Sequence, residues 1–303
     1  MKNFILRLFI FLIIALVSVE IYIRMNHLTI DIPQRTINDQ GIQAYKSNQT
    51  GYWSKGAHTW QINAEGWPGK LPQSMNHLIT LIGDSHIENF MNPNECNLGT
   101  ILNNEEMRYN FLEVGRSGAT FIEYLEISKY LYSKYNPELQ FVFVKESDFS
   151  ESLLQRGRRQ DVTQVNLKER KIIDGELKNP ALKKFLYSIK TLYFFRSALD
   201  IDILKLPFRK GNQTKSIKED KVREDAQKLL EYVASSYDTK NILFFLHPET
   251  REEIVDVFDQ FNLQHYKFNA KNNLKWRNSK NDVAHWNCFG FQEAAKQIIN
   301  LIN

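Results

Sequence analysis

The chain has 303 residues, and its 39 Lys and Arg against 35 Asp and Glu leave a net charge of only +4. An apolar fraction of 43% that includes 20 Phe is enough for a packed core and excludes a disordered chain. Two cysteines, Cys96 and Cys288, exclude a disulfide framework and a zinc site of the usual spacing. They either form one disulfide bond with each other or remain two buried free thiols. No Walker-type loop, HExxH or CxxC motif is present, so we expect no cofactor and no metal.

The N-terminal segment is apolar from Phe4 to Ile23, apart from Arg7 and Glu20 near its two ends. About 20 residues of helix match the ~30 Å hydrocarbon core of a membrane, and both charges can reach its interfaces. A cleaved signal peptide is the alternative, but no A-x-A-like cleavage site follows the apolar run. We therefore predict an uncleaved signal anchor at residues 1–25. The flanking basic residues favour a cytoplasmic N-terminus, with the remaining chain on the extracytoplasmic side.

Residues 26–75 lack helical periodicity and are rich in Gly, Asn, Trp and Tyr. Alternation in HTWQIN predicts a short strand. We expect a connecting extension packed on the main domain. Trp53, Trp60 and Trp67 have two interpretations: a surface that stacks on sugars, or rings that cover an edge of that domain.

The stretch LITLIGDSHIENF begins at residue 78 with an almost wholly apolar run, which predicts a buried strand. Gly83 ends the run, and Asp84, Ser85 and His86 precede an amphipathic segment. Ser85 would thus stand at the carboxyl end of a strand, where open α/β sheets bind ligands, beside helix amides that favour negative charge. The alternative is an Asp-Ser pair that only caps an ordinary helix.

The following chain alternates between strands and helices. We predict further strands at 111–114, 139–144, 241–249 and 264–268, and helices at 121–135 and 252–261. This order is typical of a flavodoxin-like, mostly parallel five-stranded sheet with helices on both faces. His247 ends the fourth strand at the same edge as Ser85; it either contacts a substrate or caps the strand.

A basic insertion at about 151–238 interrupts that alternation. Residues 155–223 hold 18 Lys and Arg against 8 Asp and Glu, a net charge of +10. We expect a hairpin with its turn near 168–170, followed by one aromatic-rich amphipathic helix over 181–208. Such a segment resembles an interfacial element attracted to anionic lipid. It could equally bind an anionic glycan, or form a solvated face. A domain that faces outward excludes nucleic acid as a partner.

Near the C-terminus, the block NDVAHW places Asp282 three residues before His285, and we expect an amphipathic helix after Gly290. A serine hydroxyl needs an adjacent base, and the base needs a group that orients it. Ser85, His285 and Asp282 supply these three roles.

With these blocks, the chain resembles the SGNH (GDSL-type) hydrolase family, in which Gly-Asp-Ser follows the first strand and a terminal Asp-x-x-His supplies base and orienter. The segment EVGRSGAT at 113–120 stands where the second family block is expected. The resemblance implies a three-layer α/β/α fold. It also implies that the backbone amides of Ser85 and Gly115 act as oxyanion donors.

The third family block is where this chain departs. The family usually carries Gly-x-Asn-Asp there, and its Asn is a further oxyanion donor. In this chain, Ser147 stands nearest to the Asn and Asp148 matches the Asp. Loss of one donor can lower the rate by ~10²–10³. Either Ser147 substitutes, another group does, or the enzyme is slow.

The expected organisation is an anchor at 1–25, an extension at 26–75 and an SGNH-like domain at 76–303. The resemblance implies a membrane-anchored serine esterase or O-acyltransferase that removes or transfers acetyl or acyl groups on cell-envelope glycans. One alternative is an esterase of lipids or phospholipids at the membrane surface. Another is a non-catalytic binding or assembly protein that kept the fold. The sequence identifies no protein partner.

Overall fold

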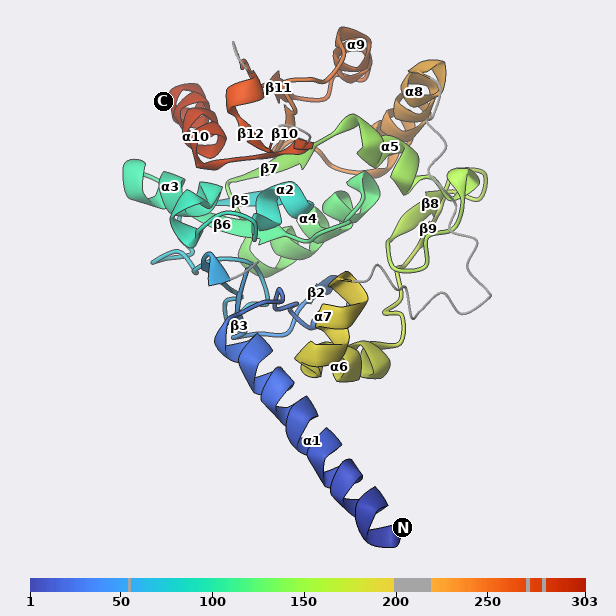
Figure 1. Cartoon of the computed structure of the whole chain (residues 1–303). Coiled ribbons are helices and arrows are strands. Elements are labelled where there is room, and N and C mark those ends of the chain that lie inside the picture. Colours follow the sequence, from blue (N-terminus) through green and yellow to red (C-terminus); the bar gives the residue numbers. More distant parts are fainter. Residues whose placement is uncertain (54–55, 199–218, 271–272, 280–281) are drawn as a thin grey trace. The chain divides into compact units, whose positions relative to one another are not determined.

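A computed structural model describes residues 1–53, 56–198, 219–270, 273–279 and 282–303. The chain divides into two compact units (Figure 1). The first, here called the anchor unit, comprises residues 1–34, 50–60 and 179–215. The second, here called the sheet unit, comprises residues 35–49, 61–178 and 216–303. The basic insertion is therefore shared between the two units.

The sheet unit is built on five parallel strands in the order β11-β10-β7-β5-β6. Their bounds are β5 (Leu78–Gly83), β6 (Asn110–Gly115), β7 (Leu139–Val144), β10 (Ile242–Leu246) and β11 (His265–Lys267). This is the flavodoxin-like strand order, with the switch point beside the first strand. The predicted strands and their parallel arrangement are confirmed.

Helices cover both faces of this sheet, which confirms the predicted three-layer α/β/α architecture (Figure 1). Leu78 and Ile82 of β5 pack in the same core as α4 (Phe121–Tyr135), α8 (Glu219–Ser236) and α9 (Glu252–Gln260). Ile79 and Leu81 point to the other face, towards α3 (Leu98–Glu105) and α10 (Cys288–Ile302). A strand buried on both faces needs apolar residues throughout, which explains the continuous run of β5.

Shorter elements complete the sheet unit. Three antiparallel pairs are formed by β1 (Arg35–Ile37) with β2 (Gln43–Tyr45), β8 (Gln164–Asn166) with β9 (Lys171–Ile173), and β12 (Arg277–Ser279) with β13 (Asp282–Trp286). The pair β8–β9 is the hairpin predicted around 168–170. The remaining helices are α2 (Ser85–Glu88), α5 (Glu146–Ser152), η2 (Asn94–Cys96), η3 (Leu154–Arg156) and η4 (Asn273–Lys275).

The helix expected after Gly290 begins two residues earlier, at Cys288. Asn287 is its N-cap, and its side chain accepts a hydrogen bond from the Gly290 N–H at 3.0 Å. Such a cap satisfies one of the free amides of the first turn, so the glycine lies inside the helix.

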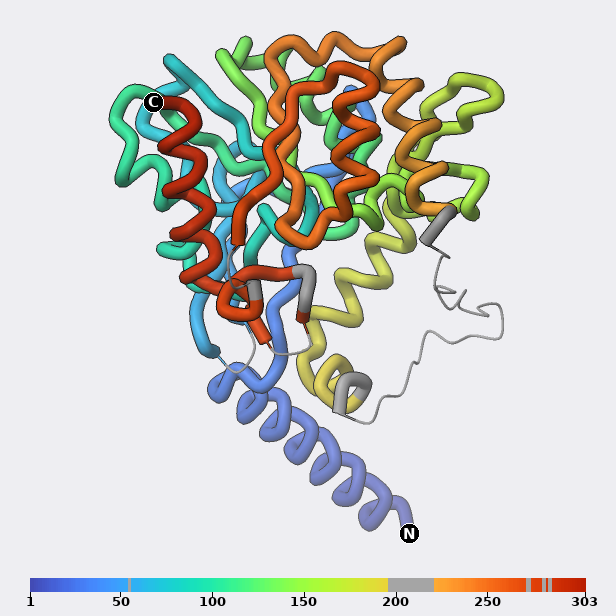
Figure 2. The backbone as a smooth tube through the Cα atoms, turned by 90° about the horizontal axis from the view of Figure 1, so that it is seen from above, coloured from blue at the N-terminus to red at the C-terminus, as the bar shows by residue number. Residues whose placement is uncertain are grey.

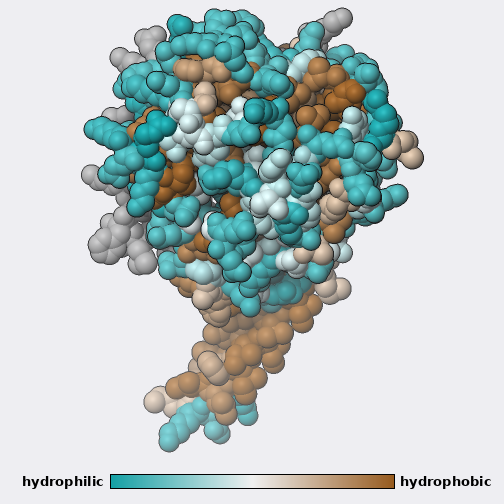
Figure 3. Space-filling model, turned by 180° about the vertical axis from the view of Figure 1, so that it is seen from behind, coloured by the Kyte–Doolittle hydropathy of each residue, from teal (hydrophilic) through white to brown (hydrophobic). Residues whose placement is uncertain are grey.

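The anchor unit contains α1 (Lys2–Met25), β3 (Thr50–Tyr52), α6 (Pro180–Ser188) and α7 (Lys190–Ala198). β4 (Thr59–Gln61) pairs with β3, and its last residue belongs to the sheet unit. Helix α1 is long and apolar enough to cross a membrane, and Figure 3 shows it as a hydrophobic column with a hydrophilic N-terminal tip.

The expectation of one helix over 181–208 is wrong for its described part. Two helices, α6 and α7, are separated at Ile189, whose backbone is extended (φ −98°, ψ 94°). The break exposes the first amides of α7, and the Glu20 carboxylate accepts hydrogen bonds from two of them. Residues 199–208 lie outside the described part of the chain.

Two of the three tryptophans of the extension have buried side chains. Trp60 lies in the anchor unit, and Trp67 packs in the core of the sheet unit that contains α4. Their rings are covered, so neither is available to stack on a sugar. Trp53 is half-buried.

Candidate active site

A tight turn joins β5 to α2 and carries the predicted nucleophile. Asp84 is the N-cap of α2, and its Oδ1 accepts the His86 N–H at 2.9 Å. Ser85 follows as the first helical residue and is half-buried. A Cβ atom on Gly83 would lie 2.6 Å from Cγ1 of Ile87. Only glycine therefore allows α2 to fold back against the end of the strand.

The structure brings the three predicted triad residues together. Ser85 Oγ lies 2.8 Å from His285 Nε2, across 200 residues of sequence. On the other side of the ring, His285 Nδ1 lies 2.9 and 3.0 Å from the two carboxylate oxygens of Asp282. With its Nδ1 proton donated to Asp282, the imidazole presents Nε2 as the acceptor for the serine hydroxyl. This is the hydrogen-bonded order that a serine nucleophile requires.

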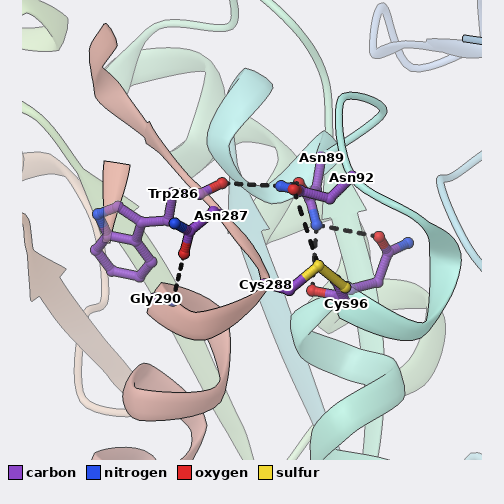
Figure 4. Close-up of a disulfide and its surroundings, with 8 residues drawn as sticks. Asn89, Asn92, Cys96, Trp286, Asn287, Cys288 and Gly290 are labelled. Atoms are coloured by element: carbon purple, nitrogen blue, oxygen red, sulfur yellow. Dashed lines mark hydrogen bonds between the residues drawn. A yellow bond between two sulfur atoms is a disulfide. The ribbon is translucent and has the colours of Figure 1, made fainter. Parts of the chain in front are cut away.

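His285 lies on β13, and its neighbour Trp286 holds that strand in place. The Trp286 indole is buried, and its Nε1 donates to His247 Nε2 at 3.1 Å. Asn92 Nδ2 donates to the Trp286 carbonyl at 2.8 Å (Figure 4). His247 therefore braces the residue beside the predicted base. This role differs from the two that the sequence suggests for His247, contact with a substrate or capping of the strand.

A disulfide links Cys96 to Cys288, with 4.9 Å between their Cα atoms (Figure 4). Cys96 ends η2, in the segment that follows α2, and Cys288 is the first residue of α10, three residues after His285. Of the two alternatives for these cysteines, a disulfide or free thiols, the structure shows the disulfide. It joins the segment after the predicted nucleophile to the segment after the predicted base.

Gly115 lies at the end of β6 and is buried. A Cβ atom there would stand 2.2 Å from the backbone nitrogen of Glu88, so this glycine allows α2 to pack against the strand end. The next loop is held by Glu88, whose Oε1 accepts the Ser117 N–H at 2.7 Å and the Tyr45 hydroxyl. Gly118 is half-exposed, has a φ of +77°, and no atom lies within 4 Å of a Cβ placed on it.

Ser147 is the second residue of α5 and is exposed. Its hydroxyl lies 3.4 Å from Asp148 Oδ1, and no hydrogen bond joins it to Ser85 or His285 in the described structure. The structure thus does not bring Ser147 to the triad. Asp148 is buried, and its Oδ2 accepts hydrogen bonds from the Lys145 N–H and the Tyr124 hydroxyl.

Lys145 follows the last residue of β7 and lies beside the predicted nucleophile. Its ammonium pairs with Asp84 Oδ2 at 2.5 Å, and that oxygen lies 3.4 Å from Ser85 Oγ. Only 19% of the Lys145 side chain is exposed. A small cavity beside this pair is lined by Asp84, Lys145, His247 and Trp286, among others. The only sequence signal was a lysine at the carboxyl end of a buried strand.

The charges of this cluster follow from burial and pairing. Burial opposes the charge on Asp84, but the adjacent Lys145 outweighs it and lowers the pKa of Asp84. Burial and the charge of Asp84 raise the pKa of Asp148 to about 7. Burial lowers the pKa of His247 to about 4, so its ring is neutral at pH 7. Among the described residues, no group of three or more His, Cys, Asp or Glu could hold a metal ion.

A scan against protein-family models finds no match, and a search of curated proteins finds none either. Among solved structures, the chain is similar to the psychrotrophic esterase EstA from Pseudoalteromonas sp., with 11% identity over 75% of this chain and 100% of that chain, at a TM-score of 0.37. It is also similar to TesA, with 10% identity over 75% and 98% at 0.38. A third is a protein from Bacteroides ovatus described as a GDSL-like lipase, with 15% identity over 74% and 97% at 0.35. The chemistry proposed for this chain therefore rests on its own side chains.

Proposed function

We propose that this protein is a serine acyl-transfer enzyme, an esterase or an O-acyltransferase, with Ser85 as nucleophile, His285 as general base and Asp282 as its orienter. The observation that carries the proposal is the continuous hydrogen-bonded chain of these three residues, at 2.8 and 2.9 Å. It lies at the carboxyl end of β5, where open α/β sheets bind their ligands.

The proposed reaction has two halves. Ser85 Oγ attacks the carbonyl carbon of an ester while its proton passes to His285 Nε2, and Asp282 stabilises the imidazolium. When the tetrahedral intermediate collapses, His285 returns the proton to the departing alkoxide, which leaves the acyl group on Ser85. In the second half, water or a sugar hydroxyl gives its proton to His285 and attacks the acyl-enzyme. When the second tetrahedral intermediate collapses, His285 returns this proton to the departing Ser85 Oγ, which releases an acid or a new ester.

The charge on the carbonyl oxygen needs donors. We assign the backbone amides of Ser85 and Gly115 to this role, and the half-exposed Gly118 offers another amide after the same strand. Ser147 would contribute only if its hydroxyl left Asp148. Lys145 is better supported, because one carboxylate separates its ammonium from Ser85. Its positive charge would neutralise the Asp84 carboxylate, which would otherwise repel the oxyanion.

A serine-reactive fluorophosphonate tests the proposal directly. We expect rapid labelling of the intact chain at a single peptide, the one that contains Ser85, and loss of labelling in Ser85→Ala. Labelling of another serine at the same rate, or ester turnover that is unchanged in Ser85→Ala, would contradict it. An unreactive Ser85 in a folded chain would favour the non-catalytic alternative.

We also propose that α1 anchors the enzyme and that the catalytic part lies on the extracytoplasmic side. The length and composition of α1 support the anchor. The Cys96–Cys288 bond supports an oxidising compartment, because disulfides persist outside the cytosol. Co-flotation of the intact chain with lipid vesicles, and its extraction by detergent but not by high salt, are the expected results. Recovery of a chain that lacks residues 1–23 would instead indicate a cleaved signal peptide.

Acylated cell-envelope glycans are the proposed substrates, on the basis of the family resemblance. We also propose that the anchor ends at residue 25 and the extension at residue 75, and that the main domain contains the basic insertion at 151–238. Turnover of acetyl esters on sugars against long-chain esters separates the glycan substrate from a lipid substrate. Transfer to an added sugar acceptor, measured by product analysis, separates an O-acyltransferase from an esterase.

A further inference from the structure

Helix α6 of the anchor unit buries none of its residues, although its sequence is amphipathic. Leu182 and Phe185 are 45% and 58% exposed. On α7, Leu192 and Phe195 are 39% and 47% exposed. These four residues are here called the apolar edge of α6–α7. An amphipathic helix gains its stability by burying its apolar face, so this edge calls for a partner.

The two helices are attached to the C-terminal end of α1 within the anchor unit (Figure 2, yellow beside blue). The Glu20 carboxylate accepts the backbone N–H groups of Lys190 at 3.0 Å and Thr191 at 2.7 Å, and the Thr191 hydroxyl at 2.6 Å. Arg24 donates to the Ser188 carbonyl at 2.5 Å. The last two turns of α1 thus hold both the end of α6 and the start of α7.

This attachment fixes the depth at which the apolar edge meets a bilayer that α1 spans. From Phe4 to Arg24 an α-helix rises ~30 Å, which matches a hydrocarbon core of ~30 Å. Arg24 therefore lies at the border between hydrocarbon and headgroups, where charged side chains are tolerated, and Glu20, one turn earlier, is paired with it. Helices bonded to them lie in the interfacial layer.

The charge of this segment fits the same layer. Residues 179–198 contain four basic residues and no acidic one. One of them, Lys190, pairs with Asp31 of the same unit. On α6, Lys183 and Lys184 stand beside the exposed Phe185, a composition typical of interfacial helices on anionic membranes.

We propose that α6–α7 is a membrane-docking element whose apolar edge inserts into the interfacial layer of an anionic bilayer, on the side to which α1 emerges. The inference rests on the anchor part of the proposed function. It adds that the protein touches lipid through a second, non-spanning surface, and that Glu20 couples the two.

Depth-dependent quenching tests this in the intact chain. Phe185→Cys is labelled with an environment-sensitive fluorophore and reconstituted in vesicles of phosphatidylcholine and phosphatidylglycerol; the native cysteines are already bonded to each other. Met107→Cys, at an 89% exposed position of the sheet unit, is the matched control. Nitroxides near the lipid headgroups should quench the probe at 185 at least about threefold more than the probe at 107. Lys183→Glu with Lys184→Glu should reduce this quenching, and more so in vesicles that contain phosphatidylglycerol.

The outcomes separate the two proposals. If the intact chain does not float with vesicles, the proposed anchor and the proposed docking element are both refuted. If it floats and the probe at 185 is quenched no more than the probe at 107, only the docking element is refuted. Disulfide cross-linking between two Phe185→Cys chains in membranes would show that a second copy covers the apolar edge, which also overturns the lipid assignment.

Discussion

The predicted nucleophile and the predicted base are positioned in different ways. Ser85 is held by its immediate neighbours: Gly83 permits the tight turn, and Asp84 caps α2. The ring of His285 is oriented by the nearby Asp282, but the strand end that carries it is held by residues far away in sequence. Asn92 and His247 bond its neighbour Trp286, and a disulfide ties Cys288 to residue 96.

The difference concerns what each half of the site depends on. The Ser85 turn rests on packing and on buried carboxyl groups such as Glu88 and Asp148, so protonation should affect it. The position of His285 rests on a covalent bond and two long-range hydrogen bonds, so reduction should affect it. A site assembled in this way has one half sensitive to pH and another sensitive to thiols.

The largest effect should come from removal of either reacting group. Ser85→Ala and His285→Ala should each lower kcat by about 10⁴–10⁶, because the hydroxyl is a poor nucleophile without the base. The double variant should be no worse than either single one, since the two residues act as a unit. Asp282→Ala should retain more activity. Steady-state hydrolysis of one acyl ester measures all four, and losses that add in the double variant would refute the triad.

Loss of the disulfide should come next. Cys96→Ser with Cys288→Ser removes a link between residues 192 apart in sequence and should lower the free energy of unfolding by about 2–5 kcal/mol. Because Cys288 lies so near His285, kcat should fall as well. Chemical denaturation and kinetics check both effects. Reductant should reproduce both effects in the wild type and have no further effect on the double variant. A wild type whose stability and kcat do not change with reductant would contradict the proposed dependence of the His285 half on the disulfide.

Lys145→Met should lower kcat by about 10–100-fold with little change in KM, since the Asp84 carboxylate, left without its cation, would repel the oxyanion as it forms. Lys129→Met is the matched control, because that side chain is 64% exposed on α4 and lies in an i,i+3 ion pair. Its activity should match the wild type. Equal kinetics for the two variants would remove Lys145 from the site.

Buried Glu113 provides a pH test for the Ser85 half of the sheet unit. Burial raises its pKa from the ordinary value of 4.5 to about 8, although it accepts the Gly99 N–H. The folded state thus binds a proton that the unfolded state has released, so this contribution to stability is present below about pH 4.5 and is lost as pH rises through about 8. The loss amounts to at most about 1.4 kcal/mol per pH unit. Glu113→Gln should flatten the pH dependence of thermal unfolding between pH 5 and 8, whereas Glu169→Gln, at an exposed position between β8 and β9, should leave it unchanged. Two parallel profiles for Glu113→Gln and the wild type would contradict the assignment.

The smallest effect is expected at Ser147. Its hydroxyl faces Asp148 and solvent, so Ser147→Ala should change kcat by less than about twofold. A loss of about 10²-fold would instead show that the side chain turns towards the oxyanion during turnover. The same kinetic assay decides between them.

The sequence was sufficient wherever the signal was local. The buried run before Gly83 and the helix at 121–135 were read directly, because strand and helix periodicity and the proline after the helix lie within one segment. The order of Ser85, Asp282 and His285 predicted a triad whose members the structure brings together. Features set by distant partners were not readable.

Three such features illustrate this. Two cysteines alone do not indicate whether they meet, and only the approach of η2 to α10 brings Cys96 to Cys288. The break at Ile189 follows from capping by Glu20, about 170 residues earlier in the chain. At the end of β7, position in the family block pointed to Ser147, but α5 starts at Glu146 and leaves that serine exposed, while Lys145 reaches Asp84.

The separation of 200 residues between Ser85 and His285 has a consequence for how the enzyme is made. An unfolded chain passing through an export channel contains both residues but no active site, because β6, β7 and β10 must first assemble the sheet between them. On the proposed extracytoplasmic topology, acyl chemistry would therefore begin only after translocation, in the compartment where Cys96 and Cys288 can be oxidised. The proposed enzyme would then be inactive towards cytoplasmic esters during its synthesis.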